Sequence, residues 1–352
     1  MDAVPPSDKS APEVARIRAA LLDWYAVHAR TLVWRAPPGS HDRPDPYRVW
    51  LSEVMLQQTT TPHATPYFLA FTARWPTVEA LAAAGDSDVM AAWAGLGYYA
   101  RARNLLACAR AVARDHDGVF PGTEAELLKL PGVGAYTAAA VAAIAFEQPA
   151  NVVDGNVERV MSRLFAVEAP LPAARPHLKA LAARFVLGDQ PGAEHADWPQ
   201  ALMDLGATIC RPKSPLCEQC PVAFGCAALA TGEPGRYPLK SKKAERPHRR
   251  GIAWVLRDEQ GRVALVRRPD KGLLGGMLGL PTSHWSDAPD ATPPVAADWQ
   301  DAGSIDHIFT HFSLTLTVRV ATGTGDFLWT DETQALADLP TVFRKALERA
   351  LA

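Results

Sequence analysis

Two carboxylates in the sequence have surroundings that favour opposite protonation states. Glu53 lies in residues 49–59, a pattern typical of a helix with apolar side chains on almost every face. Burial of an unpaired carboxylate raises its pKa, so we expect Glu53 to hold a proton near neutral pH. Asp154 begins the helical pattern Asp-Gly-Asn-Val-Glu-Arg-Val, where free backbone N–H groups and the helix dipole favour the ionised form. Such an acid and anion pair suits hydrolysis, whereas a surface glutamate and a purely structural helix cap are the alternatives.

Four of the five cysteines form a compact group. They are separated by six, two and five residues, at Cys210, Cys217, Cys220 and Cys226. Four thiols in one short segment indicate a metal or cluster site rather than disulfides. A single loop with this uneven spacing favours an iron-sulfur cubane, and zinc is the alternative. Cys108 stands alone in a helical segment, and we expect it to be a small buried apolar residue.

Residues 130–138 read Leu-Pro-Gly-Val-Gly-Ala-Tyr-Thr-Ala and join two helical patterns. Gly132 and Gly134 allow a tight turn and a close approach of the backbone to another molecule. The helix that follows presents unpaired N–H groups and the positive end of its dipole, which suit a phosphate. Because any corner between helices can contain such glycines, a purely structural turn is the alternative.

The elements that must position these residues fall into two regions. The 352 residues exceed one typical domain. Residues 13–230 have a helical pattern almost throughout, which predicts a helical domain over residues 1–230. Residues 231–250 are rich in Pro, Gly, Lys and Arg and are expected to be a basic interdomain linker. Within residues 251–352, a hairpin pattern at 251–270 and the alternating run 313–320 predict a small α+β domain.

The net charge of the whole chain, −2, does not indicate a nucleic-acid partner. Residues 236–250, however, hold seven Lys or Arg against one Glu, which is a local charge of +6. A second basic group consists of Arg101, Arg103, Arg110 and Arg114. Such groups can follow DNA phosphates, and a solvated linker is the alternative for the first group. The first 14 residues are polar and no apolar run is long enough for a bilayer, so we expect a bacterial cytoplasmic protein without a membrane partner.

Taken together, these motifs resemble those of a known enzyme family. The cysteine spacing resembles the [4Fe-4S] loop of the endonuclease III superfamily of DNA glycosylases, and residues 130–138 resemble its helix-hairpin-helix. Segments 49–59, 95–105 and 152–157 extend the likeness over residues 20–230 and toward the adenine-specific family of that superfamily. The resemblance implies a mainly α fold, a helix-hairpin-helix DNA glycosylase core with a [4Fe-4S] loop, followed by a C-terminal α+β nudix-like domain.

The resemblance implies a base-excision-repair glycosylase that hydrolyses the N-glycosidic bond of adenine mispaired with 8-oxoguanine or guanine. Glu53 would protonate the flipped adenine and then help to activate water, while Asp154 would stabilise the oxocarbenium-like sugar or bond to it transiently. Bifunctional relatives carry a lysine where Tyr136 stands, and a phenol cannot form their Schiff base. We therefore expect a monofunctional enzyme whose Tyr136 hydroxyl lies near Asp154 or the sugar; a tyrosine that only packs the hairpin is the alternative.

Other matched positions imply contacts with the extruded base and its surroundings. Gln57 lies one helical turn beyond Glu53, and Gln58 follows at the predicted helix end. Gln58 would insert near the vacated base position, and Tyr98 would wedge beside the opposite base.

The family's adenine pocket is matched less closely. Val33 replaces a proline that the family commonly has, and residues 36–46 are longer than usual. The remaining residues that the resemblance assigns to substrate and DNA binding are Arg30, Trp34, Gly132, Gly134 and Asn156.

The C-terminal region resembles the last domain of the same family through residues 272–281. The Arg-Glu-x-x-Glu-Glu segment that holds magnesium in nudix hydrolases does not occur in residues 251–352. The resemblance therefore implies that this domain reads 8-oxoguanine and does not hydrolyse nucleotides. Its candidate residues are Phe309, Thr310 and His311, with Thr in place of the family's Ser, while ordinary loop histidines are the alternative for His307 and His311.

The implied cofactor is a [4Fe-4S] cluster, and the implied partner is double-stranded DNA that contains an A:8-oxoguanine or A:G mispair. We expect a monomer that associates with the bacterial nucleoid when it acts. Three other functions stay open. They are a lysine-dependent strand-cleaving endonuclease III activity, a magnesium-dependent nudix hydrolase, and a non-enzymatic iron-sulfur DNA sensor.

Overall fold

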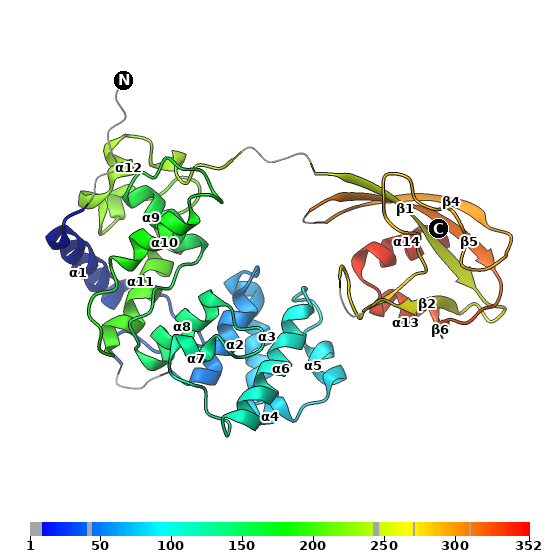
Figure 1. Ribbon diagram of the computed structural model, residues 1–352, viewed down its shortest axis with the longest axis horizontal. Helices are drawn as coiled ribbons and strands as arrows, with labels where there is room; N and C mark the ends of the chain where they lie inside the picture. Colours follow the sequence, from blue (N-terminus) through cyan, green and yellow to red (C-terminus); the bar gives the residue numbers. More distant parts are fainter. Residues whose placement is uncertain (1–8, 41–43, 242–245, 270–271, 310) are drawn as a thin grey trace. The chain divides into compact units, whose positions relative to one another are not determined.

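The structure is a computed structural model that describes residues 9–40, 44–241, 246–269, 272–309 and 311–352 (Figure 1). The chain divides into two compact units, Met1–Ser241 and Lys242–Ala352. Thr310, one of the predicted recognition residues, lies outside the described residues. In the part of the chain that is described, no helix is both long and apolar enough to cross a membrane.

The first unit is helical, as the pattern of residues 13–230 predicts. Its α-helices are α1 (Ala11–His28), α2 (Pro46–Leu56), α3 (Thr61–Arg74), α4 (Val78–Ala82), α5 (Asp86–Ala92), α6 (Ala100–Asp115), α7 (Glu124–Leu127), α8 (Ala135–Phe146), α9 (Gly155–Leu164), α10 (Arg175–Ala183), α11 (Ala193–Thr208) and α12 (Ala227–Ala230). Three short 3-10 helices follow α11, namely η1 (Cys217–Gln219), η2 (Ala223–Gly225) and η3 (Pro234–Arg236).

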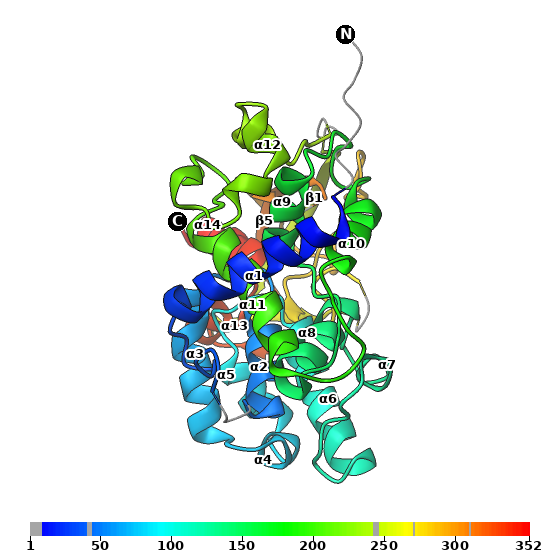
Figure 2. The same ribbon diagram turned by 90° about the vertical axis from the view of Figure 1, so that its left-hand side faces the viewer.

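Three helices, α2, α8 and α11, connect two groups of helices in this unit (Figures 1 and 2). Helix α8 is Ala-rich and buried along almost its whole length, so its small side chains let both α2 and α11 pack closely against it. Helix α11 also contacts α1 and α9, whereas α2 contacts α3 and α6. The candidates Glu53 on α2 and Tyr136 on α8 are therefore held by the core of the unit.

Helix α2 carries Glu53 and has a well-defined start and end. The Asp45 side chain accepts a hydrogen bond from the Tyr47 backbone N–H, and Pro46 occupies the first helical position, where its missing N–H costs nothing. The helix ends at Leu56. The prediction that Gln58 stands at the helix end is corrected here, because Gln57 is already the C-cap and Gln58 lies beyond it with a φ of 57°.

The second unit is a sheet with two helices. Its elements are β1 (His248–Arg257), β2 (Val263–Arg267), β3 (Leu278–Gly279), β4 (Gln300–Ile308), β5 (Ser313–Thr322), β6 (Leu328–Thr330), α13 (Glu332–Asp338) and α14 (Thr341–Leu351). The strand order is β3-β2-β1-β5-β4, with β6 paired to β2. Strands β1 and β5 are parallel, and the other neighbours are antiparallel.

The predicted β patterns of this unit are confirmed. Strands β1 and β2 form the antiparallel pair expected over residues 251–270. The alternation in β5 buries Leu314, Leu316 and Val318 on one face, where α14 packs against the sheet. Phe343 of α14 lies so close to Gly279 that a Cβ there would meet the ring at 2.8 Å.

The predicted linker, residues 231–250, is in part ordered against the first unit. Tyr237 is buried, and its carbonyl accepts a hydrogen bond from the Arg163 guanidinium. The Leu171 N–H donates to the carbonyl of Leu239, and the backbones of Leu171 and Lys240 form an isolated parallel β-bridge. Strand β1 of the second unit already begins at His248.

Candidate active site

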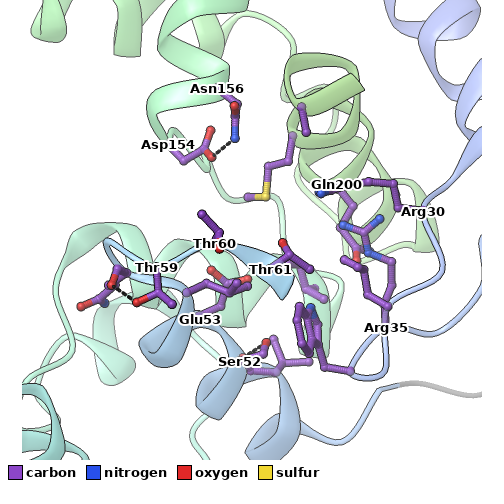
Figure 3. A pocket seen from close by; sticks show the side chains of 18 of the residues that line it. Arg30, Arg35, Ser52, Glu53, Thr59, Thr60, Thr61, Asp154, Asn156 and Gln200 are labelled. Carbon is purple, nitrogen blue, oxygen red and sulfur yellow. Dashed lines mark hydrogen bonds between the residues drawn. The ribbon is translucent and has the colours of Figure 1, made fainter. Parts of the chain in front are cut away.

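A cavity of about 560 Å³ opens among four helices, α2, α8, α9 and α11, and the segment that follows α1. This volume falls within the usual range of small-molecule sites, roughly 300–1,000 Å³. The predicted residues that line it are Arg30, Trp34, Glu53, Gln57, Gln58, Tyr136, Asp154 and Asn156. Residues far apart in sequence thus form one site, and Glu53 and Asp154 face it from different walls (Figure 3).

Glu53 is buried in the wall of the cavity, and its pKa is strongly perturbed. The Tyr136 hydroxyl donates a 2.7 Å hydrogen bond to Glu53 Oε2. Burial raises the pKa of Glu53 from 4.5 to about 7, with the nearby Asp154 adding to the rise and Tyr136 and Arg35 opposing it. A pKa of about 7 allows Glu53 to hold a proton near neutral pH, which is the direction that the apolar helix predicts.

The Tyr136 hydroxyl has a different partner from the expected one. We predicted that the phenol would bond near Asp154 or the sugar, whereas its hydroxyl donates to Glu53. Asp154 is close enough to contribute, because burial and the charges of Glu53 and Asp154 raise the pKa of Tyr136 well above its ordinary value. Tyr136 therefore stays neutral and acts as a hydrogen-bond donor.

Asp154 is the N-cap of α9, as its sequence pattern predicts. Its Oδ1 accepts from the Val157 backbone N–H at 2.8 Å, and its Oδ2 accepts from Asn156 Nδ2 at 2.8 Å (Figure 3). The positive end of the α9 dipole adds a favourable field for a carboxylate. Both oxygens are held by donors, which fixes the direction of the side chain into the cavity.

A buried aspartate holds two arginines at the cavity wall. Asp204 of α11 is fully buried and accepts from Arg30 Nε at 2.6 Å and from Arg35 Nη1 at 2.7 Å. It also accepts from the Arg30 backbone N–H at 2.9 Å. The predicted pocket residue Arg30 is thus anchored through Asp204, and Figure 3 shows Arg30, Arg35 and Gln200 together on this side of the cavity.

Sequence reasoning missed Asp204, Arg35 and Gln200. A usable signal existed for Asp204, because it is a lone carboxylate in the apolar run Ala-Leu-Met-Asp-Leu, the same anomaly that marks Glu53. Arg35 and Gln200 show no such signal, since their roles depend on contacts with residues distant in the chain.

The two residues predicted to insert into the duplex lie on separate loops. Gln58 is exposed at the mouth of the cavity, and Gln57 Nε2 contacts Thr137 Oγ1 at 3.3 Å. Tyr98 does not line the cavity; it is 56% exposed on the loop before α6. Both Gln58 and Tyr98 have positive φ angles, 57° and 50°, a backbone conformation that non-glycine residues rarely adopt.

The second basic group is not a free phosphate-binding patch, which corrects the prediction for three of its four members. Arg110 pairs with Asp86, and Arg114 pairs with Asp115. Arg101 is half-buried and donates to backbone carbonyls. Only Arg103 of this group is exposed without an ion pair in the described residues.

The two hairpin glycines play different parts. Gly132 has a φ of 71°, and a Cβ there would meet the Asn104 Cβ at 2.5 Å, so only glycine fits. Gly134 has a φ of −89°, is the N-cap of α8, and has nothing within 4 Å of an added Cβ. The open space at Gly134 lies before the helix N–H groups, where an anion can approach.

The four grouped cysteines line one small cavity of about 30 Å³, together with Arg163. Arg163 Nη1 donates to Cys210 Sγ at 3.3 Å. Among the described residues, no set of three or more His, Cys, Asp or Glu is placed to hold a metal ion. Cys108 is buried in the core, as predicted, and burial raises its pKa to about 12.

The candidate residues of the second unit lie at the connection between β4 and β5. The Phe309 backbone N–H donates to the Phe312 carbonyl at 2.9 Å, and the Phe309 ring stacks on Trp285 with centroids 5.7 Å apart. His311 is exposed, whereas His307 is half-buried with a pKa lowered by burial. The turn thus presents one half-buried aromatic ring and one exposed imidazole.

Two parts of the sequence match known families. Residues 51–182 match the HhH-GPD superfamily of base excision DNA repair proteins, and residues 252–349 match the NUDIX domain. The solved structure of a thermostable thymine-DNA glycosylase has a TM-score of 0.55 and 31% identity, covering 62% of this chain and 98% of that one. A non-covalent endonuclease III–DNA complex, at 21% identity and a TM-score of 0.51, covers 64% of this chain and 98% of that one and shows the shared fold.

Several curated relatives are adenine DNA glycosylases. The Mycobacterium tuberculosis (strain H37Rv) protein is 41% identical, covering 70% of this chain and 76% of that protein. The human protein is 35% identical, covering 87% of this chain and 67% of its own length. The Arabidopsis thaliana protein is 38% identical over 79% of this chain, which spans only about half (49%) of that relative.

Proposed function

The chain belongs to the adenine DNA glycosylase family of base excision repair enzymes, and from that premise we propose that it hydrolyses the N-glycosidic bond of adenine mispaired with 8-oxoguanine or guanine. The observation that carries the proposal is the pair of carboxylates in one cavity. Glu53 is buried in apolar surroundings with a raised pKa, and Asp154 is held by donors at a helix N-terminus. Two such environments support the proposal of one acid and one anion that act on the same substrate.

In the proposed reaction, Glu53 acts first as a general acid. Its carboxyl proton moves to a ring nitrogen of the extruded adenine, which makes the base a better leaving group as the bond to C1′ breaks. The Glu53 carboxylate that results then removes a proton from the attacking water. The Tyr136 hydroxyl supports this second form, because it donates to Oε2 and so stabilises the negative charge.

Asp154 stabilises the positive charge that develops on the sugar, by its field or through a transient covalent bond. Its two hydrogen bonds fix the carboxylate, so no reorganisation is needed when the charge appears. Tyr136 stands where bifunctional relatives carry a lysine, and a phenol cannot form a Schiff base with C1′. The proposed product is therefore an abasic site in an intact strand.

We propose that the DNA is gripped by several parts of the first unit. The N-terminus of α8, next to the open space at Gly134, receives a phosphate. Gln58 enters near the vacated base position, and Tyr98 wedges beside the opposite base. Arg30, Trp34 and Gln57 at the cavity, together with Asn156 beside Asp154, contact the extruded nucleotide.

We propose that the second unit reads 8-oxoguanine through the β4–β5 turn, with Phe309 and His311 as the described candidates. The ring of Phe309, supported by Trp285, offers a stacking surface, and His311 offers a hydrogen-bonding group beside it. Thr310 shares this prediction. Loss of discrimination between 8-oxoguanine and guanine in Phe309→Ala, at unchanged activity on A:G, would support this assignment, and equal losses on both would contradict it.

We propose that Cys210, Cys217, Cys220 and Cys226 hold a [4Fe-4S] cluster. Four thiols around one cavity fit such a group, and the Arg163 guanidinium supplies a donor to Cys210 sulfur. When bound, the cluster would link the cysteine loop to the rest of the fold, and no step of the hydrolysis uses it. Iron and acid-labile sulfide in the purified protein would support the proposal, whereas stoichiometric zinc would contradict it.

The test of the function is a duplex with one A:8-oxoguanine pair, analysed for free adenine and for strand breaks before alkali treatment. We expect free adenine and no break. Glu53→Gln should abolish release while mispair binding persists, and Glu348→Gln, an exposed glutamate on α14, is the matched control. A strand break together with borohydride trapping of the enzyme on its DNA product, magnesium-dependent release of pyrophosphate or phosphate from 8-oxo-dGTP, or binding without release would each point to one of the three other functions. A G:T duplex in parallel tests the substrate that the name of the thymine-DNA glycosylase relative suggests.

We also infer that the protein acts as a monomer in the cytoplasm of a bacterium, on the nucleoid. Sedimentation of the purified protein with and without duplex DNA, and imaging of a fluorescent fusion, test these two predictions separately.

A further inference from the structure

A single guanidinium joins two loops that the candidate site uses separately. Arg101, in the first turn of α6, donates to the carbonyls of Val54 at 3.0 Å and Met55 at 3.2 Å. It also donates to the carbonyls of Leu96 at 3.0 Å and Gly97 at 3.3 Å. Its five donors in a rigid fork make such a four-way contact possible, which a lysine cannot reproduce.

The first pair of carbonyls belongs to the last turn of α2, the helix that carries Glu53. Carbonyls in a helix's last turn have no partner within the helix, and this turn carries the negative end of the dipole. Helix α2 has no basic residue in its own last turn, so Arg101 supplies the cation from α6. The position of the helix end, and of Gln58 just beyond it, therefore depends on Arg101.

The second pair of carbonyls immediately precedes Tyr98. The guanidinium also lies 5.6 Å from the centre of the Tyr98 ring and 5.3 Å from that of the buried Trp93. Tyr98 and Gln58 both hold positive φ angles, a strained conformation that persists only where the surroundings fix it. Arg101 fixes the backbone ahead of each of these two exposed residues.

We propose that Arg101 is a positioning residue that sets the Gln58 loop and the Tyr98 loop at one fixed separation, so that both enter the duplex as a unit during base extrusion. Arg101 acts through the two loops and does not touch the reacting atoms. This inference rests on the proposed function, because it gives a task to the two residues that the proposal places in the DNA.

The experiment measures extrusion apart from chemistry. 2-Aminopurine replaces the target adenine opposite 8-oxoguanine, and its fluorescence on unstacking is followed in the Glu53→Gln protein, which keeps the base attached. Arg101→Met is compared with Arg110→Met, a control on the same helix whose guanidinium caps the carbonyls of Ala82 and Ala84 and pairs with Asp86. Adenine release under single-turnover conditions is measured for both substitutions with Glu53 restored.

We expect Arg101→Met to lower both the extruded fraction and the release rate, by about 10- to 100-fold, because small misplacements of positioned groups have effects of this size. Arg110→Met should behave like the parent protein. Gln58→Ala and Tyr98→Ala should show coupled effects when Arg101 is present and independent effects when it is absent. The pH dependence of release should keep its midpoint, because Arg101 does not act on Glu53.

Normal extrusion in Arg101→Met, a shifted pH midpoint, or an equal loss in Arg110→Met would overturn the proposal. If Arg101→Met does not fold, Arg101→Lys keeps the charge but not the fork, and it should fold and still lose the coupling between Gln58 and Tyr98. Retained coupling in Arg101→Lys would also overturn it. Failure of the proposed function is read separately, as absence of adenine release by the unsubstituted protein.

Discussion

The hydrogen bond between Tyr136 and Glu53 leads to a pH prediction with a definite sign. Tyr136→Phe removes the donor to Oε2 and leaves the ring in place. This bond stabilises the charged carboxylate and so lowers the pKa of Glu53, which burial alone would raise further. A hydrogen bond to a charged group contributes roughly 1.5–3 kcal/mol, and 1.36 kcal/mol corresponds to one pKa unit. We therefore expect the substitution to raise the pKa of Glu53 from about 7 to about 8 or 9.

The assay is the dependence of kcat/KM for adenine release on pH, which reports groups of the free enzyme. Because the protonated form of Glu53 is the acid, activity should fall as pH rises through its pKa. The midpoint of this fall should lie near pH 7 in the unsubstituted protein and about one to two units higher in Tyr136→Phe.

Tyr47→Phe is the matched control. It also removes one phenolic hydroxyl, from a buried tyrosine on α2, the helix that carries Glu53. The Tyr47 hydroxyl donates to the Trp75 carbonyl, and Tyr47 does not line the cavity. An unchanged or lowered midpoint in Tyr136→Phe, or an equal rise in Tyr47→Phe, would refute the reasoning.

Three further predictions concern stability and binding. The pKa of Glu53 is about 7 in the folded protein and 4.5 ordinarily, so its contribution to the stability of the fold is lost as the pH rises through 7. Glu53→Gln should therefore raise the free energy of unfolding by up to about 3 kcal/mol near pH 8 and by almost nothing near pH 4. Denaturant titrations at the two pH values check this, and an equal gain at both would contradict it. Gly132→Ala should destabilise the fold by at least about 1 kcal/mol because of its φ of 71° and the Asn104 contact. Gly134→Ala should fold normally but bind duplex DNA more weakly. Calorimetry measures the first effect and binding titrations the second, and a Gly132→Ala protein of unchanged stability would count against the assigned backbone strain. Asp204→Asn should lower the free energy of unfolding by about 3–5 kcal/mol, since it leaves Arg30 and Arg35 without their buried charged partner. Asp86→Asn, which breaks an exposed ion pair with Arg110, is unfolded alongside as the control. An equally small loss of stability in both proteins would show that Arg30 and Arg35 find other partners.

Much of the fold was predictable because its signals are local. The apolar surroundings of Glu53, the cap at Asp154, the Pro-Gly-x-Gly turn and the period-two pattern of β5 each depend on residues within about one or two turns of the chain. The same reasoning failed at the end of α2, where a helical pattern continues to residue 59 but the helix stops at Leu56. Helix ends depend on partners for the last carbonyls, and here that partner, Arg101, lies 46 residues further along the chain.

By itself, the sequence determined which groups could act: one acid in an apolar helix, one capped anion, a tyrosine in place of a lysine, and four cysteines on one loop. Only the tertiary structure decided which of them meet. The Tyr136 hydroxyl donates to Glu53, 83 residues earlier in the chain. Asp204 accepts hydrogen bonds from Arg30 and Arg35, which precede it by 174 and 169 residues. Residue type and spacing set local conformation and intrinsic chemistry, whereas pKa values and hydrogen-bond partners depend on burial and distance. The burial of these side chains and the distances between them are set only when α2, α8 and α11 pack into one core.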